Sequence, residues 1–278
     1  MAKRTIGCAL WSLGVPDTVQ SLGTASRIGF KAVQFAFLQA VDLEAAGLKA
    51  VTAALKRTGL EVPAGMIAFA GESYASIAAV RATGGFAPAG FFAERLEHCR
   101  RTGRALAALG IRHVTTHAGF IPEPGDAAYG GVLERVGRAV DALHEAGLTV
   151  GLETGQETSA VLLEVLKDLG RDFLSVNFDP ANLVLYGVED PVEAAHAVAR
   201  HVSMMHAKDA TWSARPRQDW GAEVPLGKGA VDLGMVLAAL AGGGFAGAII
   251  VEREAGDDRA GDLAAGRGFL EKLLRQGV

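Results

Sequence analysis

Apolar residues follow two spacings along this chain. Short continuous apolar runs alternate with longer segments in which apolar residues recur every three or four positions. A continuous run is typical of a parallel strand covered on both faces, and the longer spacing is typical of an amphipathic helix. We expect strands near residues 5–11, 31–37, 60–67, 111–117, 148–153, 173–179, 201–206 and 247–252. The helical spacing falls on Leu43–Arg57, Phe91–Leu109, Tyr129–Ala146, Thr158–Leu169, Pro191–Arg200 and Leu233–Ala241.

A glycine separates several predicted helices from the strand that follows, as at Gly59, Gly110 and Gly147. Glycine adopts the left-handed conformation that ends a helix. Alternation of strands and helices over 278 residues favours a (β/α)8 TIM barrel. The alternative is an open doubly wound sheet, but residues 11–14 are not the glycine-rich phosphate turn that such a sheet usually carries. No shift in composition marks a boundary, and we predict one α/β TIM-barrel domain over residues 1–278.

The composition excludes several classes of protein. The chain has 31 acidic and 27 basic residues, and this net charge of −4 argues against a nucleic-acid partner. No apolar run is long enough to span a bilayer, and the N-terminal segment lacks a proper apolar stretch and cleavage site. We therefore expect a cytoplasmic protein with no membrane partner. Cys8 and Cys99 are too few for a disulfide framework or a zinc ribbon, and we expect small buried or half-buried thiols.

Four strands in the second half of the chain end on a side chain that binds metals, namely Glu153, Asp179, His206 and Glu252. Burying a lone carboxylate costs several kcal/mol, so three of them with one imidazole need a common reason. The carboxyl ends of barrel strands meet on one face, where adjacent strands lie about 5 Å apart. We predict that these residues bind one divalent metal ion, Mn²⁺, Mg²⁺, Co²⁺ or Zn²⁺. The alternative is that each is a polar cap at the barrel mouth.

The motifs around these residues resemble the xylose-isomerase-like TIM barrels, a family of sugar and sugar-phosphate isomerases and epimerases. The resemblance covers essentially the whole chain. It is carried by GLE at 151–153, NFDPAN at 177–182, HAKD at 206–209, PLGKG at 225–229 with Val231 and Asp232, and Val251 with Glu252. In ketose 3-epimerases of this family, residues matching the four strand-end residues hold the metal. The resemblance implies that Glu153 and Glu252 also move protons, and that the chain forms a homo-oligomer, a dimer or tetramer, and acts on a small carbohydrate, with manganese as one candidate metal.

We expect a metal-dependent isomerase or epimerase that acts on a sugar, a sugar phosphate or a cyclitol ketone. Removing a proton beside a carbonyl produces an enediolate, whose charge a cation stabilises. Returning the proton to the opposite face inverts the carbon, and returning it to the neighbouring carbon interconverts aldose and ketose. The alternatives are a lyase of the same superfamily that acts on a keto sugar, a non-catalytic sugar-binding barrel and, more remotely, an endonuclease IV-like DNA repair enzyme.

Two positions depart from the family pattern and leave the substrate open. Asn182 stands where many ketose epimerases of this kind carry a histidine, and an amide bonds a hydroxyl without taking a proton. Gln34 stands on the second strand, where family members often place a glutamate. Endonuclease IV relatives need additional histidine ligands, so these two residues and the acidic net charge speak against that alternative.

Substrate binding is predicted for five residues, His117, Asn182, Lys208, Trp11 and Arg217. His117 ends the fourth strand, and Lys208 follows a metal-ligand candidate closely enough to meet a substrate oxygen. The ring of Trp11 suits stacking on a sugar face, although packing at the barrel mouth explains it equally well.

The two longest connections, residues 70–90 and 207–231, follow the third and seventh strands, where we expect lids over the active face. Arg215 and Arg217 lie in the second connection and suit a phosphate or carboxylate, or a solvated surface. Residues 227–229 lie where barrels often bind phosphate, but Asp232 would repel the anion as that helix's N-cap. A structural salt bridge is the expected role of Asp209. The remaining histidines are expected to be structural or exposed, namely His98, His113, His144, His196 and His201.

Overall fold

A ring of parallel strands forms the centre of the molecule. The structure, a computed structural model, describes residues 4–277. The strands close into a barrel in the order β1-β10-β7-β6-β5-β4-β3-β2. Their bounds are β1 Ile6–Ala9, β2 Ala32–Phe35, β3 Glu61–Ile67, β4 His113–His117, β5 Thr149–Glu153, β6 Leu174–Phe178, β7 Val202–Ala207 and β10 Ile249–Val251. Each overlaps one strand expected from the sequence, which confirms the predicted TIM barrel.

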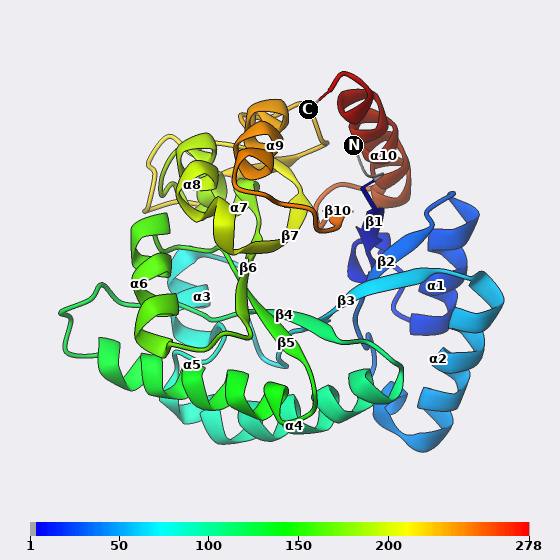
Figure 1. The fold of residues 1–278 in the computed structure, drawn as a ribbon, viewed down its shortest axis with the longest axis horizontal. Coiled ribbons are helices and arrows are strands. Elements are labelled where there is room, and N and C mark those ends of the chain that lie inside the picture. The colour runs from blue at the N-terminus through cyan, green and yellow to red at the C-terminus, as the bar shows by residue number, and fades with distance from the viewer. Residues whose placement is uncertain (1–3, 278) are drawn as a thin grey trace.

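Helices surround the barrel as an outer layer (Figure 1). Their bounds are α1 Thr18–Arg27, α2 Ala45–Thr58, α3 Ile77–Thr83, α4 Phe92–Ala108, α5 Tyr129–His144, α6 Ser159–Leu169, α7 Pro180–Tyr186, α8 Pro191–Val198, α9 Leu233–Gly242 and α10 Arg259–Arg275. The final helix α10 packs beside β1, and β1 pairs in parallel with β10, so the two ends of the barrel sequence close the ring. No helix within residues 4–277 is both long and apolar enough to cross a membrane.

Helix ends follow local chemistry. The helix predicted from Thr158 begins one residue later, because the Thr158 hydroxyl caps it by accepting from the Val161 N–H at 3.3 Å. It ends at Leu169 because Gly170 takes the left-handed conformation, with φ at 60°. The spacing of apolar residues located the ends of the six predicted helices to within two residues. In the helix at Ser159–Leu169, the capping residues set the exact first and last residue.

The core lies between the barrel strands and the helices. β10 is buried along its whole length, and the same holds for most of β4 and β7. Cys8 and Cys99 are both free and buried, and burial raises the pKa of each thiol to about 12. This confirms the reading of the cysteines as small core residues.

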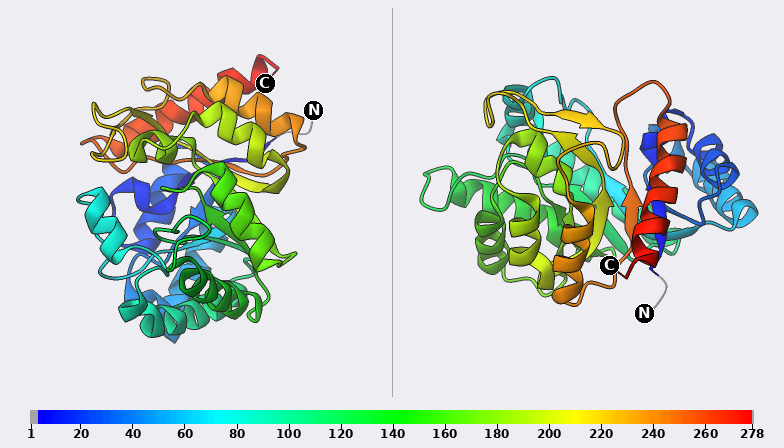
Figure 2. Two further views of the ribbon diagram at one scale, coloured as in Figure 1. Left: turned by 90° about the vertical axis from the view of Figure 1, so that its left-hand side faces the viewer. Right: turned by 90° about the horizontal axis from the view of Figure 1, so that it is seen from above.

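The two long connections contain structure that the apolar spacing does not predict. Residues 70–90 include the short helix α3. Residues 207–231 include an antiparallel hairpin of β8 Asp209–Thr211 and β9 Ala222–Val224. The right-hand view of Figure 2 shows this hairpin at the end of the barrel opposite the C-terminus, where the strands finish. These elements are only three to seven residues long, too short for a periodic pattern to identify them.

Candidate metal centre

The four strand-end residues meet at the carboxyl end of the barrel. Glu153 is the last residue of β5, His206 lies in β7, and Asp179 and Glu252 directly follow β6 and β10. One potential ligand atom of each residue lies within 4.8 Å of those of the other three. His206 Nδ1 lies 3.1 Å from Glu252 Oε2, 3.4 Å from Glu153 Oε1 and 3.6 Å from Asp179 Oδ2. The cluster can therefore surround a single ion.

Asp179 has two separate tasks. Its Oδ1 accepts from the backbone N–H groups of Ala181 and Asn182, at 2.8 and 3.1 Å, and so caps α7. Pro180 occupies the first turn of α7, where its missing N–H costs nothing. The sequence predicted Asp179 within the sixth strand, but the strand ends at Phe178 because Asp179 begins the helix. The second oxygen, Oδ2, faces the cluster.

His206 is oriented from behind by an amide. Its Nε2 lies 2.7 Å from Gln34 Oε1, while Gln34 Nε2 donates to Thr115 Oγ1 at 2.7 Å. Asn177 Nδ2 lies 3.1 Å from the same Nε2, so two amides hold this nitrogen, and Nδ1 faces the three carboxylates. A second partner of this kind fixes the tautomer and ring orientation of metal-binding histidines. Gln34 thus has a role in the cluster that the sequence did not assign.

The donor atoms fit a divalent cation. Four buried atoms of the cluster have no hydrogen-bond partner within residues 4–277, namely Glu153 Oε2, Asp179 Oδ2, His206 Nδ1 and Glu252 Oε2. Lys208 Nζ forms ion pairs with Glu252 Oε2 at 3.2 Å and Asp179 Oδ2 at 3.8 Å. Buried polar atoms in folded proteins are normally satisfied, and one cation among the four atoms would satisfy them all. Carboxylate oxygens with one imidazole nitrogen suit Mg²⁺, Mn²⁺, Co²⁺ or Zn²⁺.

Negative charge dominates the surroundings of these atoms. Burial would lower the pKa of His206, but the Glu252 and Glu153 carboxylates hold it well above its ordinary value. Burial raises the pKa of Asp179 despite the nearby Lys208 ammonium. Lys208 Nζ lies 3.2 Å from Glu252 Oε2, 2.9 Å from Glu254 Oε2 and 3.8 Å from Asp179 Oδ2, so its charge is already shared among three carboxylates.

Metal binding is expected to weaken as the pH falls. The raised pKa of His206 means that a metal ion must displace a proton from the imidazole. We expect the affinity for Mn²⁺ to rise roughly tenfold per pH unit while the imidazole is protonated. Calorimetric titrations in buffers of different ionisation enthalpy would measure both the affinity and the released proton. An affinity that is independent of pH, with no proton released, would contradict this expectation.

Removing the amide behind His206 is expected to weaken the metal site without breaking a ligand. In Gln34→Leu, the imidazole Nε2 loses the Gln34 oxygen and keeps only Asn177 Nδ2 beside it, so the ring is held less firmly. We expect Mn²⁺ affinity to fall about 10- to 100-fold. Calorimetry measures the loss. The Thr115→Val variant, which removes the partner of the Gln34 amide nitrogen and a contact with Met66 Sδ but leaves the Gln34 oxygen on His206, should lose less. Equal losses in the two variants would speak against the proposed hydrogen bond.

Each glutamate of the cluster is held by a fixed donor. Trp11 Nε1 donates to Glu252 Oε1 at 2.8 Å, and Asn182 Nδ2 donates to Glu153 Oε1 at 3.1 Å. Trp11 and Asn182 were predicted to touch the substrate, and the structure adds that their polar atoms orient the two carboxylates. The second oxygen of each glutamate, Oε2, makes no hydrogen bond within residues 4–277, although that of Glu252 is ion-paired with Lys208.

A cavity of about 740 Å³ opens over the cluster. Four of the five residues predicted to bind substrate line it, namely Trp11, His117, Asn182 and Lys208. His117 Nδ1 accepts from the Gly119 N–H at 3.0 Å, while its Nε2 is buried without a partner in the described chain. Both long connections contribute to the wall, through Tyr74 and Trp220 among others, which agrees with their expected position over the active face.

Several residues lie elsewhere than expected. Arg217 lines a separate depression and donates to the Val188 carbonyl, and the exposed Arg215 pairs with Asp219. Asp209 forms no salt bridge within residues 4–277 but accepts from backbone N–H groups of Gly227, Gly229 and Val231. The backbone donors considered for a phosphate are therefore occupied by this buried carboxylate, and Gly229 is needed because a Cβ there would lie 2.1 Å from Asp209 Oδ1.

The cavity also includes residues that the sequence did not single out. His98, expected to be structural or exposed, lines the cavity from α4 together with Thr102. Tyr186 does so from α7, an element that was not predicted. Glu254 and Glu223 also line the cavity, together with Glu153 and Glu252. Of the residues that the sequence did not single out, only Glu254 had a sequence signal, its place two residues beyond a predicted metal ligand.

Comparison with known proteins gives one family. A model of the xylose isomerase-like TIM barrel family matches residues 22–273. A xylose isomerase domain protein from Planctomyces limnophilus is 32% identical, with 92% of each chain covered and a TM-score of 0.87. No curated protein is similar enough in sequence to count as a match.

Two more distant structures share the fold at 17% identity and a TM-score of 0.75. One is a xylose isomerase-like TIM barrel protein from Mycobacterium smegmatis in complex with magnesium, with coverage of 98% of this chain and 97% of that one. The other is an L-ribulose 3-epimerase, with coverage of 99% and 95%. The family model and the match to the Planctomyces protein each span most of the chain, so this protein belongs to the xylose isomerase-like TIM barrel family.

Proposed function

We propose that this protein is a divalent-metal-dependent isomerase or epimerase of an uncharged keto sugar, with Glu153 and Glu252 as its acid–base pair. The observation that carries the proposal is the matched environment of the two glutamates. Each has one oxygen held by a fixed donor and a second oxygen that makes no hydrogen bond among the described residues, with Lys208 ion-paired to that of Glu252. The two come from opposite sides of His206, on β5 and after β10. Proton removal and return on two faces of a substrate need such a pair.

The residues divide the work between binding and proton transfer. Asp179 and His206 have a ligand role alone, because the other atoms of each are occupied by α7 and by Gln34. A bound divalent ion would polarise the substrate carbonyl and stabilise the negative charge that forms when the neighbouring proton leaves. Glu153 would accept or return that proton on one face of the substrate, and Glu252 on the other.

The charge of the cavity favours a sugar without a phosphate. Among the described residues that line it, Lys208 is the single lysine or arginine, and it is paired with three carboxylates. Glu153, Glu223, Glu252 and Glu254 line the same cavity. A phosphate dianion would face this surplus of negative charge.

The names of the structural neighbours support the same class of reaction. One neighbour is an L-ribulose 3-epimerase, and another was solved with magnesium. We extend to this chain the dependence on a divalent ion and the action on a carbohydrate, and we keep the cytoplasm as the expected location and a dimer or tetramer as the expected assembly.

A solvent-exchange screen tests the proposal. Ketoses, ketose phosphates, inososes and 3-keto sugars are incubated in D₂O with Mn²⁺-loaded protein, and products are examined by NMR and mass spectrometry. We expect deuterium beside the carbonyl with the carbon skeleton retained, loss of exchange after chelation, and preference for unphosphorylated compounds. An unsaturated product would instead assign the protein to the lyase alternative, and the absence of metal-dependent exchange across the panel would contradict the proposal.

A further inference from the structure

We propose that the cavity has a second, apolar subsite, and that the sugar substrate carries an apolar aromatic substituent, as in an aryl glycoside. The inference rests on the proposed function for the sugar end of the cavity. The second subsite is a lobe formed by residues 36–43, which connect β2 to α2, and residues 66–70 at the end of β3. We call this part of the cavity the apolar lobe.

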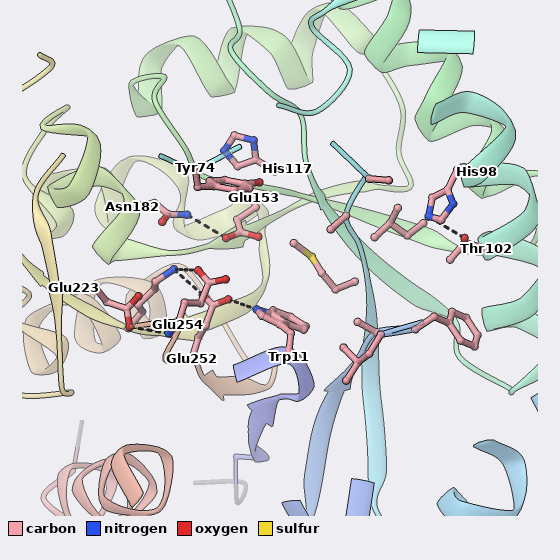
Figure 3. Close-up of a pocket in the computed structure, with 18 of the residues that line it drawn as sticks. Trp11, Tyr74, His98, Thr102, His117, Glu153, Asn182, Glu223, Glu252 and Glu254 are labelled. Carbon is pink, nitrogen blue, oxygen red and sulfur yellow. Dashed lines mark hydrogen bonds and ion pairs between the residues drawn. The ribbon is translucent and has the colours of Figure 1, made fainter. Parts of the chain in front are cut away.

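The cavity is divided chemically into two ends. One end carries Glu153, Asn182, Lys208, Glu252 and Glu254. The apolar lobe presents Phe37, Leu38, Leu43, Met66 and Ile67. Figure 3 shows His98 and Thr102 on the side of the cavity away from the labelled acidic residues. Sugar hydroxyls bind at polar ends such as the first, whereas Gln39 is the one polar side chain among the residues of the lobe that line the cavity.

The volume also exceeds what a simple sugar needs. A cavity of about 740 Å³ lies in the upper part of the range of about 300–1,000 Å³ that encloses drug-sized ligands. A six-carbon ketose has about a dozen non-hydrogen atoms, fewer than such ligands. A sugar at the metal centre would therefore leave the apolar lobe unfilled, whereas an aryl group attached to the sugar would cover it.

The far end of the cavity limits the length of the substituent. His98 Nε2 and Thr102 Oγ1 lie 3.3 Å apart on consecutive turns of α4. Both side chains belong to the cavity wall. This polar pair would meet the tip of an aromatic group, where a phenolic hydroxyl fits better than a further apolar extension.

A binding comparison tests the apolar lobe separately from catalysis. Mn²⁺-loaded protein is titrated calorimetrically with the methyl and phenyl 3-keto-glucosides, as both anomers. Burying a phenyl ring is expected to improve the dissociation constant about 10- to 100-fold over the methyl compound for at least one anomer. Equal affinities of the methyl and phenyl compounds in both anomers would overturn the inference.

A substitution that fills the apolar lobe provides a second test. Ala68 is exposed and lines the lobe, so Ala68→Trp adds an indole there without disturbing the core. We expect the phenyl-to-methyl affinity ratio to fall to about one in this variant. Ala265→Trp, on the exposed surface of α10, is the matched control and should keep the wild-type ratio. An unchanged ratio in Ala68→Trp would overturn the assignment of the aryl group to this lobe.

The outcomes separate this inference from the proposed function. An aryl preference that depends on Ala68, without metal-dependent deuterium exchange, would support the lobe and reject the acid–base role of the glutamates. Metal-dependent exchange on simple ketoses without any aryl preference would support the acid–base role of the glutamates and reject the aryl subsite. If the lobe is instead covered by a second copy of the chain, Ala68→Trp will alter the oligomeric state measured by light scattering and the aryl preference will be absent, which also overturns the inference.

Discussion

Replacing either Glu153 or Glu252 with glutamine is expected to lower the rate of metal-dependent solvent exchange by about 10²- to 10⁴-fold, the usual contribution of a positioned acid or base. Glutamine keeps the shape of the side chain and one oxygen, but it cannot accept a proton at neutral pH. Trp11 Nε1 could still donate to the side-chain oxygen at position 252, and Asn182 Nδ2 to the one at position 153. The loss should therefore fall mainly on kcat.

The two variants should also differ from one another. If the glutamates act on opposite faces, each variant should block exchange more strongly from one epimer of a substrate pair than from the other. Glu271→Gln, a charge removal on the outer helix α10, is the matched control and should leave the rates unchanged. Exchange at the wild-type rate in both cluster variants, measured with bound metal confirmed, would reject the proton shuttle.

Replacing Asp179 with asparagine is expected to reduce Mn²⁺ affinity by more than about 100-fold, beyond the usual effect of an outer partner. The amide keeps an oxygen for the Ala181 and Asn182 N–H groups, so α7 remains capped, but it places an uncharged group at the cluster. The protein should therefore fold and yet lose the stabilisation that saturating metal gives the wild type, about 2.7 kcal/mol at a metal concentration of 100 times Kd.

The chain contains a closely matched control for this change. Asp190 caps α8 in the same manner, accepting from Val192 and Glu193 before a helix that also begins with proline. Asp190→Asn should leave Mn²⁺ affinity and the metal-dependent shift in Tm as they are in the wild type. If both variants bind Mn²⁺ like the wild type in calorimetry, Asp179 is a helix cap and has no ligand role.

The sequence was sufficient for the barrel and for the group of four residues, and the reason is geometric. Short apolar stretches mark the barrel strands, even where polar residues interrupt them as in β4 and β6, and the carboxyl ends of barrel strands meet on one face. Glu153, Asp179, His206 and Glu252 could therefore be placed together without knowing any contact. His206 and Gln34 are 172 positions apart in sequence, and their hydrogen bond depends on the register of several strands, which apolar spacing does not report.

The wall of the cavity was harder to predict because it depends on side chains from irregular segments. His98 lies on a helix whose apolar spacing is typical of packing, and only its position in α4 brings it to the cavity. Asp209 was expected to form a structural salt bridge, but it is buried and accepts from backbone N–H groups of a loop 18 to 22 positions away. Arg217 had a suitable charge and sits in a suitable loop, but the turn directs it to another depression.

Anomalous diffraction from crystals of the protein soaked in Mn²⁺ tests the central claim most directly. We expect one strong manganese peak enclosed by Glu153, Asp179, His206 Nδ1 and Glu252, at the place where four buried donor atoms lack hydrogen-bond partners in the described chain. The peak should vanish in Asp179→Asn crystals and persist in Asp190→Asn crystals. A cluster without manganese at saturating concentration, with Lys208 still paired to Glu252, would contradict the metal centre and the function proposed from it.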